Sequence, residues 1–204
     1  MIVTSKGAGP AFGRGWLRAL LEFPAGHGSP AQAKLEWLVK LRWGALILAF
    51  LFAGPAYALG FLPRDNLPIF IGIVACTGLF NLLTQLLLPT KAGAISEGLL
   101  ALQMVLDLFV MVALLRLMGG LSNPVAVLFY LHVVLGGLLL QRGRSWVFLL
   151  SLHGALLWLQ AANLSFPINE QNAAFILLPH GMVLLFWHCT HFLGQHLDHQ
   201  HGRL

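Results

Sequence analysis

The residues of this chain that could do chemistry are a carboxylate and several histidines within long apolar stretches. Asp107 lies near the middle of the apolar segment 98–118, where a charge costs about 2.5–3.5 kcal/mol on membrane-insertion scales. Counting from the expected helix ends places five polar residues at one depth, roughly 9–14 Å from the side assigned below to the cytoplasm. These residues are Asn81, Asp107, His132, His153 and His188. The sequence therefore predicts a buried polar layer across the helices.

Three interpretations of this polar layer are open. The first is a hydrogen-bond network that holds the helices in register, since apolar packing gives little preference in lipid. The second is a proton-responsive or redox-coupled switch through Asp107 and the histidines. The third is ligation of a metal or a tetrapyrrole such as haem by His132, His153 or His188. His180 is expected nearer the outer side, as a lone interior histidine.

The C-terminal segment "HCTHFLGQHLDHQHGRL" (188–204) contains further histidines with helical spacing. His188 and His191, and also His196 and His199, are three residues apart, so that each pair lies on one helix face. Without the acidic or cysteine partners typical of zinc sites, they are weak metal candidates. The alternative is a cytoplasmic helix end that happens to carry histidines.

The stretch "GGLSNPV" (119–125) interrupts two apolar segments. Gly119 and Gly120 allow backbone torsions closed to other residues, and Pro124 suits the first turn of a helix. The Asn123 side chain, free backbone amides and a helix N-terminus are expected to face one spot. A carbonyl-bearing ligand such as a quinone head group could bind there, and a plain tight hairpin is the alternative.

The elements that must position these residues are membrane helices. The chain of 204 residues is 58% hydrophobic and 9% charged, whereas a soluble domain carries roughly 25% charged residues. About 20 apolar residues cross the hydrocarbon core. The expected spans are 42–62, 67–89, 98–118, 124–140, 146–164 and 173–194. The predicted fold is all-α, a polytopic bundle of six transmembrane helices.

The basic residues indicate the orientation of this bundle. Ten of them fall on one side: Lys6, Arg14, Arg18, Lys34, Lys40, Arg42, Lys91, Arg142, Arg144 and Arg203. Arg64 and Arg116 fall on the other. By the positive-inside rule, both termini are expected in the cytoplasm. The positive charge is thus expected to contact anionic lipid, with no nucleic acid as partner.

Three regions are predicted along the chain. Residues 1–34 form a basic cytoplasmic arm, in which 11–23 has the pattern of a helix lying in the membrane interface. Residues 35–195 form the six-helix domain, and residues 196–204 form a short histidine-rich tail. Cys76 and Cys189 lie in apolar runs and are expected to be ordinary small side chains.

The segments "LRW" (41–43), "LLALQMVLDLFVMVALLRL" (99–117) and "GGLSNPV" (119–125) resemble the membrane domain of RegB/PrrB/ActS-type redox-sensing histidine kinases. That family has six membrane helices and a G-G-x-x-N-P-F heptapeptide at the periplasmic end of the third. The resemblance implies a bacterial inner-membrane protein and a ubiquinone-type ligand. It assigns quinone contacts to Gly119, Gly120, Asn123 and Pro124.

Two departures from the family pattern bear on these expectations. Position 125 is valine where the family has phenylalanine, which removes an aromatic wall. The sequence up to Leu204 contains neither the phosphoacceptor helix nor the ATP-binding domain of such kinases. No catalytic set converges elsewhere, so the chain is not expected to be an enzyme.

Two functions are compatible with this pattern. The first is a kinase-less sensor domain that binds a quinone at the GGLSNP turn and relays its redox state through the last helix. The second is an accessory subunit of a respiratory or photosynthetic electron-transport complex, which packs against partners and holds quinone, lipid or pigment. Expected partners are membrane lipids and either a second copy of the chain or the subunits of a larger complex.

Overall fold

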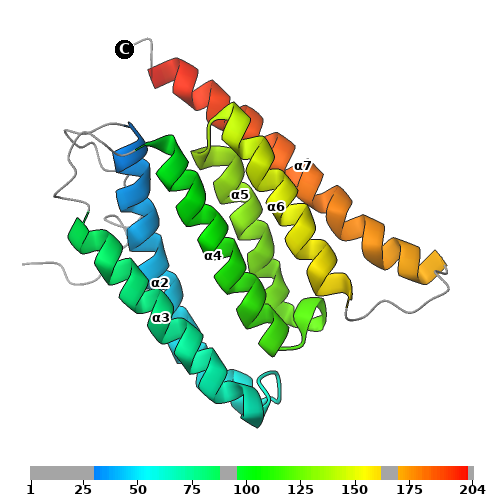
Figure 1. The fold of residues 1–204 in the computed structure, drawn as a ribbon. Coiled ribbons are helices and arrows are strands. Elements are labelled where there is room, and N and C mark those ends of the chain that lie inside the picture. The colour runs from blue at the N-terminus through cyan, green and yellow to red at the C-terminus, as the bar shows by residue number, and fades with distance from the viewer. Residues whose placement is uncertain (1–29, 88–95, 162–169, 202–204) are drawn as a thin grey trace, which may run out of the picture.

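The structure is a computed structural model that describes residues 30–87, 96–161 and 170–201, and these residues are mostly helical, without a strand among them (Figure 1). The α-helices are α2 (Pro30–Ala58), α3 (Leu67–Leu87), α4 (Glu97–Leu117), α5 (Leu128–Leu139), α6 (Arg142–Ala161) and α7 (Glu170–His201). Short 3-10 helices are η1 (Arg64–Asn66), η3 (Gly120–Ser122) and η4 (Pro124–Val127). The all-α prediction is confirmed for this part of the chain.

Four to five of these helices could span a membrane. By length and composition, four segments qualify within the described ranges: Ala31–Ala58, Arg64–Leu87, Glu97–Leu117 and Ala173–His196. Pro124–Leu139 is a shorter apolar helix. Helix α6 is outside this set, and it carries Arg144, His153 and Gln160. Because four of the described helices are long and apolar enough to cross a bilayer, the chain has the character of a membrane protein.

Helix α2 begins at Pro30, well before the expected start at residue 42. Proline suits the first helical turn, where its missing N–H is not needed. The added turns also bury apolar side chains in the main core, among them Ala31, Leu35 and Val39. Because α2 starts at 30 and α7 continues to His201, the domain limits expected after residues 34 and 195 fall inside continuous helices. The interfacial helix expected at 11–23 lies outside the described residues.

Helix α4 lies between two groups of helices (Figure 1). On one side, α2 packs against α3, and on the other, α5, α6 and α7 pack together. The buried face of α4 follows one helical stripe, made by Leu100, Met104, Leu108, Val112 and Leu115. A spacing of three or four residues keeps these side chains on one face. This stripe joins buried side chains of α2, α5, α6 and α7 in the main core.

Helices α5 and α7 approach each other closely because glycines line their contact. A Cβ on Gly137 would collide with Thr190 Oγ1 and would lie 3.1 Å from the backbone N of His191. A Cβ on Gly194 would lie 3.3 Å from the carbonyl oxygen of Gly137. Small residues of this kind allow close helix packing in membranes, where van der Waals contact drives association.

The first prediction concerns this contact. Gly137→Ala is expected to lower the free energy of unfolding by about 1–3 kcal/mol, the typical cost of overpacking. The measurement is the thermal or denaturant midpoint of the purified chain in detergent.

The matched control is Gly72→Ala on α3, where an added Cβ meets nothing within 4 Å. This control is expected to be neutral or stabilising because alanine favours helix. Adding Thr190→Ala to Gly137→Ala is expected to recover part of the loss. Equal midpoints for Gly137→Ala and Gly72→Ala would show that α5 and α7 are not in close contact.

Candidate functional site

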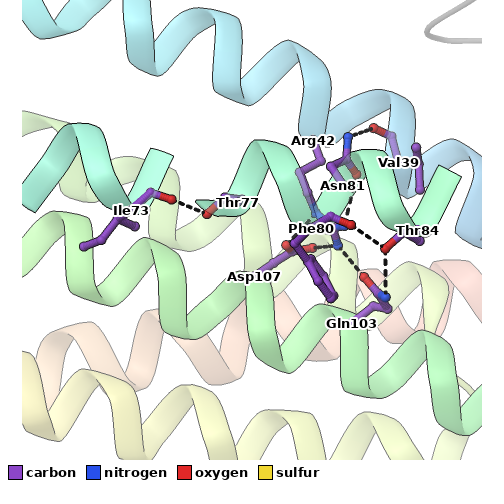
Figure 2. Close-up of polar contacts among 9 residues, drawn as sticks. All are labelled: Val39, Arg42, Ile73, Thr77, Phe80, Asn81, Thr84, Gln103 and Asp107. Carbon is purple, nitrogen blue, oxygen red and sulfur yellow. Dashed lines mark hydrogen bonds and ion pairs between the residues drawn. The ribbon is translucent and has the colours of Figure 1, made fainter. Parts of the chain in front are cut away.

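The centre of the polar site is an ion pair between α2 and α4 (Figure 2). Arg42 Nη2 donates to Asp107 Oδ2 at 2.7 Å, and Arg42 Nε lies 2.7 Å from Asp107 Oδ1. The Nε contact is one of charge rather than a well-directed hydrogen bond, since Nε has no partner of hydrogen-bond geometry in the described residues. The Arg42 side chain is only 5% exposed and the Asp107 side chain 14%, so both charges are buried inside the protein.

Two amide side chains complete the surroundings of the guanidinium. Arg42 donates from Nη1 to Asn81 Oδ1 at 3.1 Å and from Nη2 to Gln103 Oε1 at 2.9 Å. Asn81 Nδ2 in turn donates to the carbonyl oxygen of Val39 at 3.1 Å. The Arg42 Cζ also lies 5.4 Å from the ring centroid of Phe80, within the range of a cation–π interaction. The ion pair and its amides therefore join α2, α3 and α4.

The sequence prediction found two members of this cluster and misassigned a third. Asn81 and Asp107 were expected in a buried layer, and the structure brings them together through Arg42. Arg42 was counted among the cytoplasmic topology charges, which is wrong, because its side chain is buried. The signal that could have found it is the intramembrane carboxylate itself, since such a charge requires a cationic partner.

The three histidines of the predicted layer do not join this cluster through hydrogen bonds among the described residues. His132 on α5 has a buried Nδ1 without a hydrogen-bond partner there. His153 instead meets His180, with the two Nδ1 atoms 2.6 Å apart. His188 was expected to be buried but is exposed, because residues at equal depth can face different sides of their helices. His180 was expected to be a lone interior histidine, which is wrong, because it contacts His153.

Among the described side chains near the end of α7, the histidines do not converge on a metal site. No group of three His, Cys, Asp or Glu side chains that could hold a metal occurs in the described part of the chain. His191 stacks on Trp187, with ring centroids 4.9 Å apart, and its Nε2 lies 2.9 Å from Gln195 Nε2. His196 is exposed, and the side chain of His199 is outside the described residues.

The connection between α4 and α5 is a turn with a fixed internal geometry. Gly119 and Gly120 have φ angles of 98° and 69°, in the left-handed region that favours glycine. Asn123 Nδ2 donates to the carbonyl oxygen of Met118, and its Oδ1 accepts from the N–H of Val125, both at 2.8 Å. The Asn123 side chain was expected to face a ligand, but it is used inside the turn, and the residue is 4% exposed.

This turn touches both groups of helices. Asn66, in the connection between α2 and α3, donates from Nδ2 to the carbonyl oxygen of Leu117 at 2.8 Å. Met118 packs in a small apolar cluster with Leu62 and Phe70. On the other side, Gly120 is buried against the end of α6, where its Cβ would lie 3.9 Å from the carbonyl oxygen of Leu159. A change in the conformation of the turn would thus alter contacts with both groups of helices, α2 and α3 on one side and α5, α6 and α7 on the other.

The arrangement supports binding and coupling between helices. Ser122, Pro124, Val125 and Val127 are exposed around the turn, so apolar and hydroxyl groups are available to a ligand there. The Arg42–Asp107 pair lies further along α4 and has its charges satisfied within the protein. The turn is therefore the better candidate for a ligand, and the ion pair the better candidate for a contact that fixes helix positions.

The second prediction concerns the ion pair. Asp107→Leu leaves a buried guanidinium without its counter-charge, and breaking such a pair costs about 3–5 kcal/mol. The double variant Arg42→Met/Asp107→Leu is expected to lose much less stability than Asp107→Leu alone, because no charge stays buried. The coupling free energy between the two positions comes from the unfolding midpoints, in detergent, of the two single variants and the double variant.

The control for this comparison is Arg116→Met, at an exposed residue of α4. It is expected to change the midpoint little. Additive effects of the Arg42 and Asp107 substitutions would contradict a direct ion pair.

Comparisons of the chain with protein-family models, with curated proteins and with solved structures give no significant match. The resemblance to redox-sensing kinases therefore stays a prediction from the sequence.

Proposed function

We propose that this chain is a non-catalytic, sensor-type membrane domain that binds a quinone at the turn between α4 and α5 and relays the bound state through α7. The carrying observation is that the turn is internally fixed by Asn123 and contacts both groups of helices. A ligand at such a position can favour one arrangement of the helices, provided that it binds two arrangements with different affinity.

The turn offers groups suited to a quinone head group. None of the hydrogen bonds described above uses the N–H groups of Gly119 or Leu121, and because neither residue is buried, these N–H groups are the donors that we assign to a quinone carbonyl. Exposed apolar side chains next to them, such as Val125 and Val127, suit an isoprenoid tail. Asn123 acts as a positioning residue in this proposal, because its side chain is engaged within the turn.

The packing supports a path from the turn to α7. Helix α5 begins at Leu128, immediately after η4, so a shift of the turn moves α5. The close approach of Gly137 to Thr190 and Gly194 couples α5 to α7. Helix α7 continues to His201 and is the longest helix in the described part of the chain. We therefore propose α7 as the output element.

The proposal includes an orientation in the membrane. All six helices cross the bilayer of a bacterial inner membrane, with both termini in the cytoplasm and the turn at the outer face. Arg42 no longer counts as a loop charge, yet the remaining basic residues keep the same bias. Connections η1 and η3 then lie on the outer side, and Gln141, between α5 and α6, lies on the inner side.

The third prediction is that quinone co-purifies with the chain after gentle extraction from native membranes. Asn123→Ala is expected to lower the quinone content several-fold, because it removes both hydrogen bonds that fix the turn. The measurement is quinone per protein by solvent extraction and mass spectrometry. Gly120→Ala is expected to act similarly through strain at its positive φ.

Gly44→Ala serves as the matched control, since an added Cβ there meets nothing within 4 Å. It is expected to retain full quinone content. Unchanged quinone content in both turn variants, with folding intact by circular dichroism, would remove the turn as the binding site. Co-purification of stoichiometric electron-transport subunits would favour the accessory role over sensing.

The fourth prediction tests the orientation. With Cys76 and Cys189 replaced by alanine, Ser122→Cys is expected to react with an impermeant maleimide added to intact spheroplasts. Gln141→Cys is expected to react only after the membrane is opened. Ser122 and Gln141 are both exposed, so accessibility from each side is the quantity compared. The reverse pattern would place the turn on the cytoplasmic side.

A further inference from the structure

Helix α7 contains a proline, and a side chain of α6 replaces the backbone hydrogen bond that this proline removes. Pro179 has no N–H, so the carbonyl oxygen of Phe175 lacks its usual helical partner. Gln160 on α6 replaces that partner, because its Nε2 donates to the carbonyl oxygens of Phe175 at 3.0 Å and Ile176 at 3.2 Å. Gln160 is fully buried. Its amide orientation is therefore determined, with Nε2 toward two acceptors.

The orientation of Gln160 fixes the protons on two histidines. Gln160 Oε1 accepts, so His180 Nε2, 3.2 Å away, carries a proton and donates it. In a neutral ring, His180 Nδ1 is then an acceptor. The Nδ1 of His153, 2.6 Å from it, must be the donor. The chain of bonds thus leaves His153 Nε2 as an unprotonated nitrogen with a free lone pair.

The surroundings of the two histidines are apolar and follow the same pattern on both helices. The pattern L-x-x-H-G-x-x-L occurs at 150–157 on α6 and at 177–184 on α7. The leucines three residues before and four residues after each histidine lie on the histidine's own face. All four are exposed: Leu150 by 71%, Leu157 by 51%, Leu177 by 68% and Leu184 by 49%.

An imidazole lone pair on an apolar, lipid-facing surface needs a partner that lipid does not provide. We propose that His153 Nε2 is the axial ligand of a metal tetrapyrrole that lies on the surface of α6 and α7. A tetrapyrrole brings four metal ligands of its own and requires one more nitrogen together with apolar contacts. A free metal ion would require several protein ligands, and no group of three such side chains occurs in the described part of the chain.

The arrangement behind His153 matches that of a ligating histidine. Such a histidine donates its other ring N–H to a fixed acceptor, which sets the tautomer and ring orientation. Here the acceptor is His180, held in turn by Gln160, and the two imidazole planes are only 20° apart with their Nδ1 atoms facing each other at 2.6 Å. Gly154, next to His153, has nothing within 4 Å of a Cβ, so the surface beside the ligand is open.

The fifth prediction tests this site with the purified full chain in detergent, titrated with iron protoporphyrin IX. The unaltered chain is expected to shift the Soret band to the position of a histidine-ligated haem. His153→Gly is expected to lose that shift, and free imidazole is expected to restore it. His180→Phe is expected to weaken binding about 10–100-fold, the usual effect of losing an orienting partner.

His188→Ala is the matched control, because His188 is an exposed histidine of α7 outside this pair. It is expected to bind like the unaltered chain. The proposal is overturned if the unaltered chain shows no histidine-ligated spectrum, or if His153→Gly keeps it. An independent measurement is ¹⁵N NMR of labelled histidine without haem, where His153 is expected to carry its proton on Nδ1. A proton on Nε2 instead would overturn the proposal.

Discussion

The structure depends on the ion pair between Arg42 and Asp107, because neither charge can be left alone in a region that excludes water. Burying one of them unpaired is costly, and the pair is satisfied only when α2 and α4 are adjacent and Asn81 on α3 is in reach. A buried pair adds little net stability over an apolar contact of the same shape. The pair instead favours one arrangement of the helices over others. Apolar helices pack almost equally well in any order, and the ion pair determines that α2, α3 and α4 are the three that associate.

The second constraint is steric and acts on the other side of α4. Glycines on α5 and α7 remove the side chains that would separate the two helices, so that their backbones come close. Helix α4 contributes its buried apolar stripe to this group and its polar face to the ion pair. The turn at the end of α4 is bonded to Asn66 on one side and packed on α6 on the other. The two groups of helices therefore meet at α4 and at the turn that follows it.

Helix positions could be predicted from the sequence because the length of an apolar stretch is a direct signal, and α3 and α4 follow the expected ranges closely. Asp107 and Asn81 could be found as polar residues at mid-helix depth. Their partner was missed because a basic residue at the edge of an apolar stretch has the same pattern whether it is in a loop or a helix. Depth also says nothing of rotation about the helix axis, so His188 was expected inside and His180 alone. The bonds of Asn123 depend on turn torsions that composition does not encode.

The most direct test of this account is the distance between Arg42 and Asp107 in lipid. Solid-state NMR on the full chain in bilayers, with ¹⁵N in arginine side chains and ¹³C in aspartate carboxyl groups, measures their dipolar coupling, and Asp107→Asn with unlabelled asparagine identifies the signal. The account predicts a strong coupling, typical of a directly contacting pair, that vanishes in this variant. A coupling too weak for contact in the unaltered chain would contradict the ion pair and, with it, the arrangement of α2, α3 and α4.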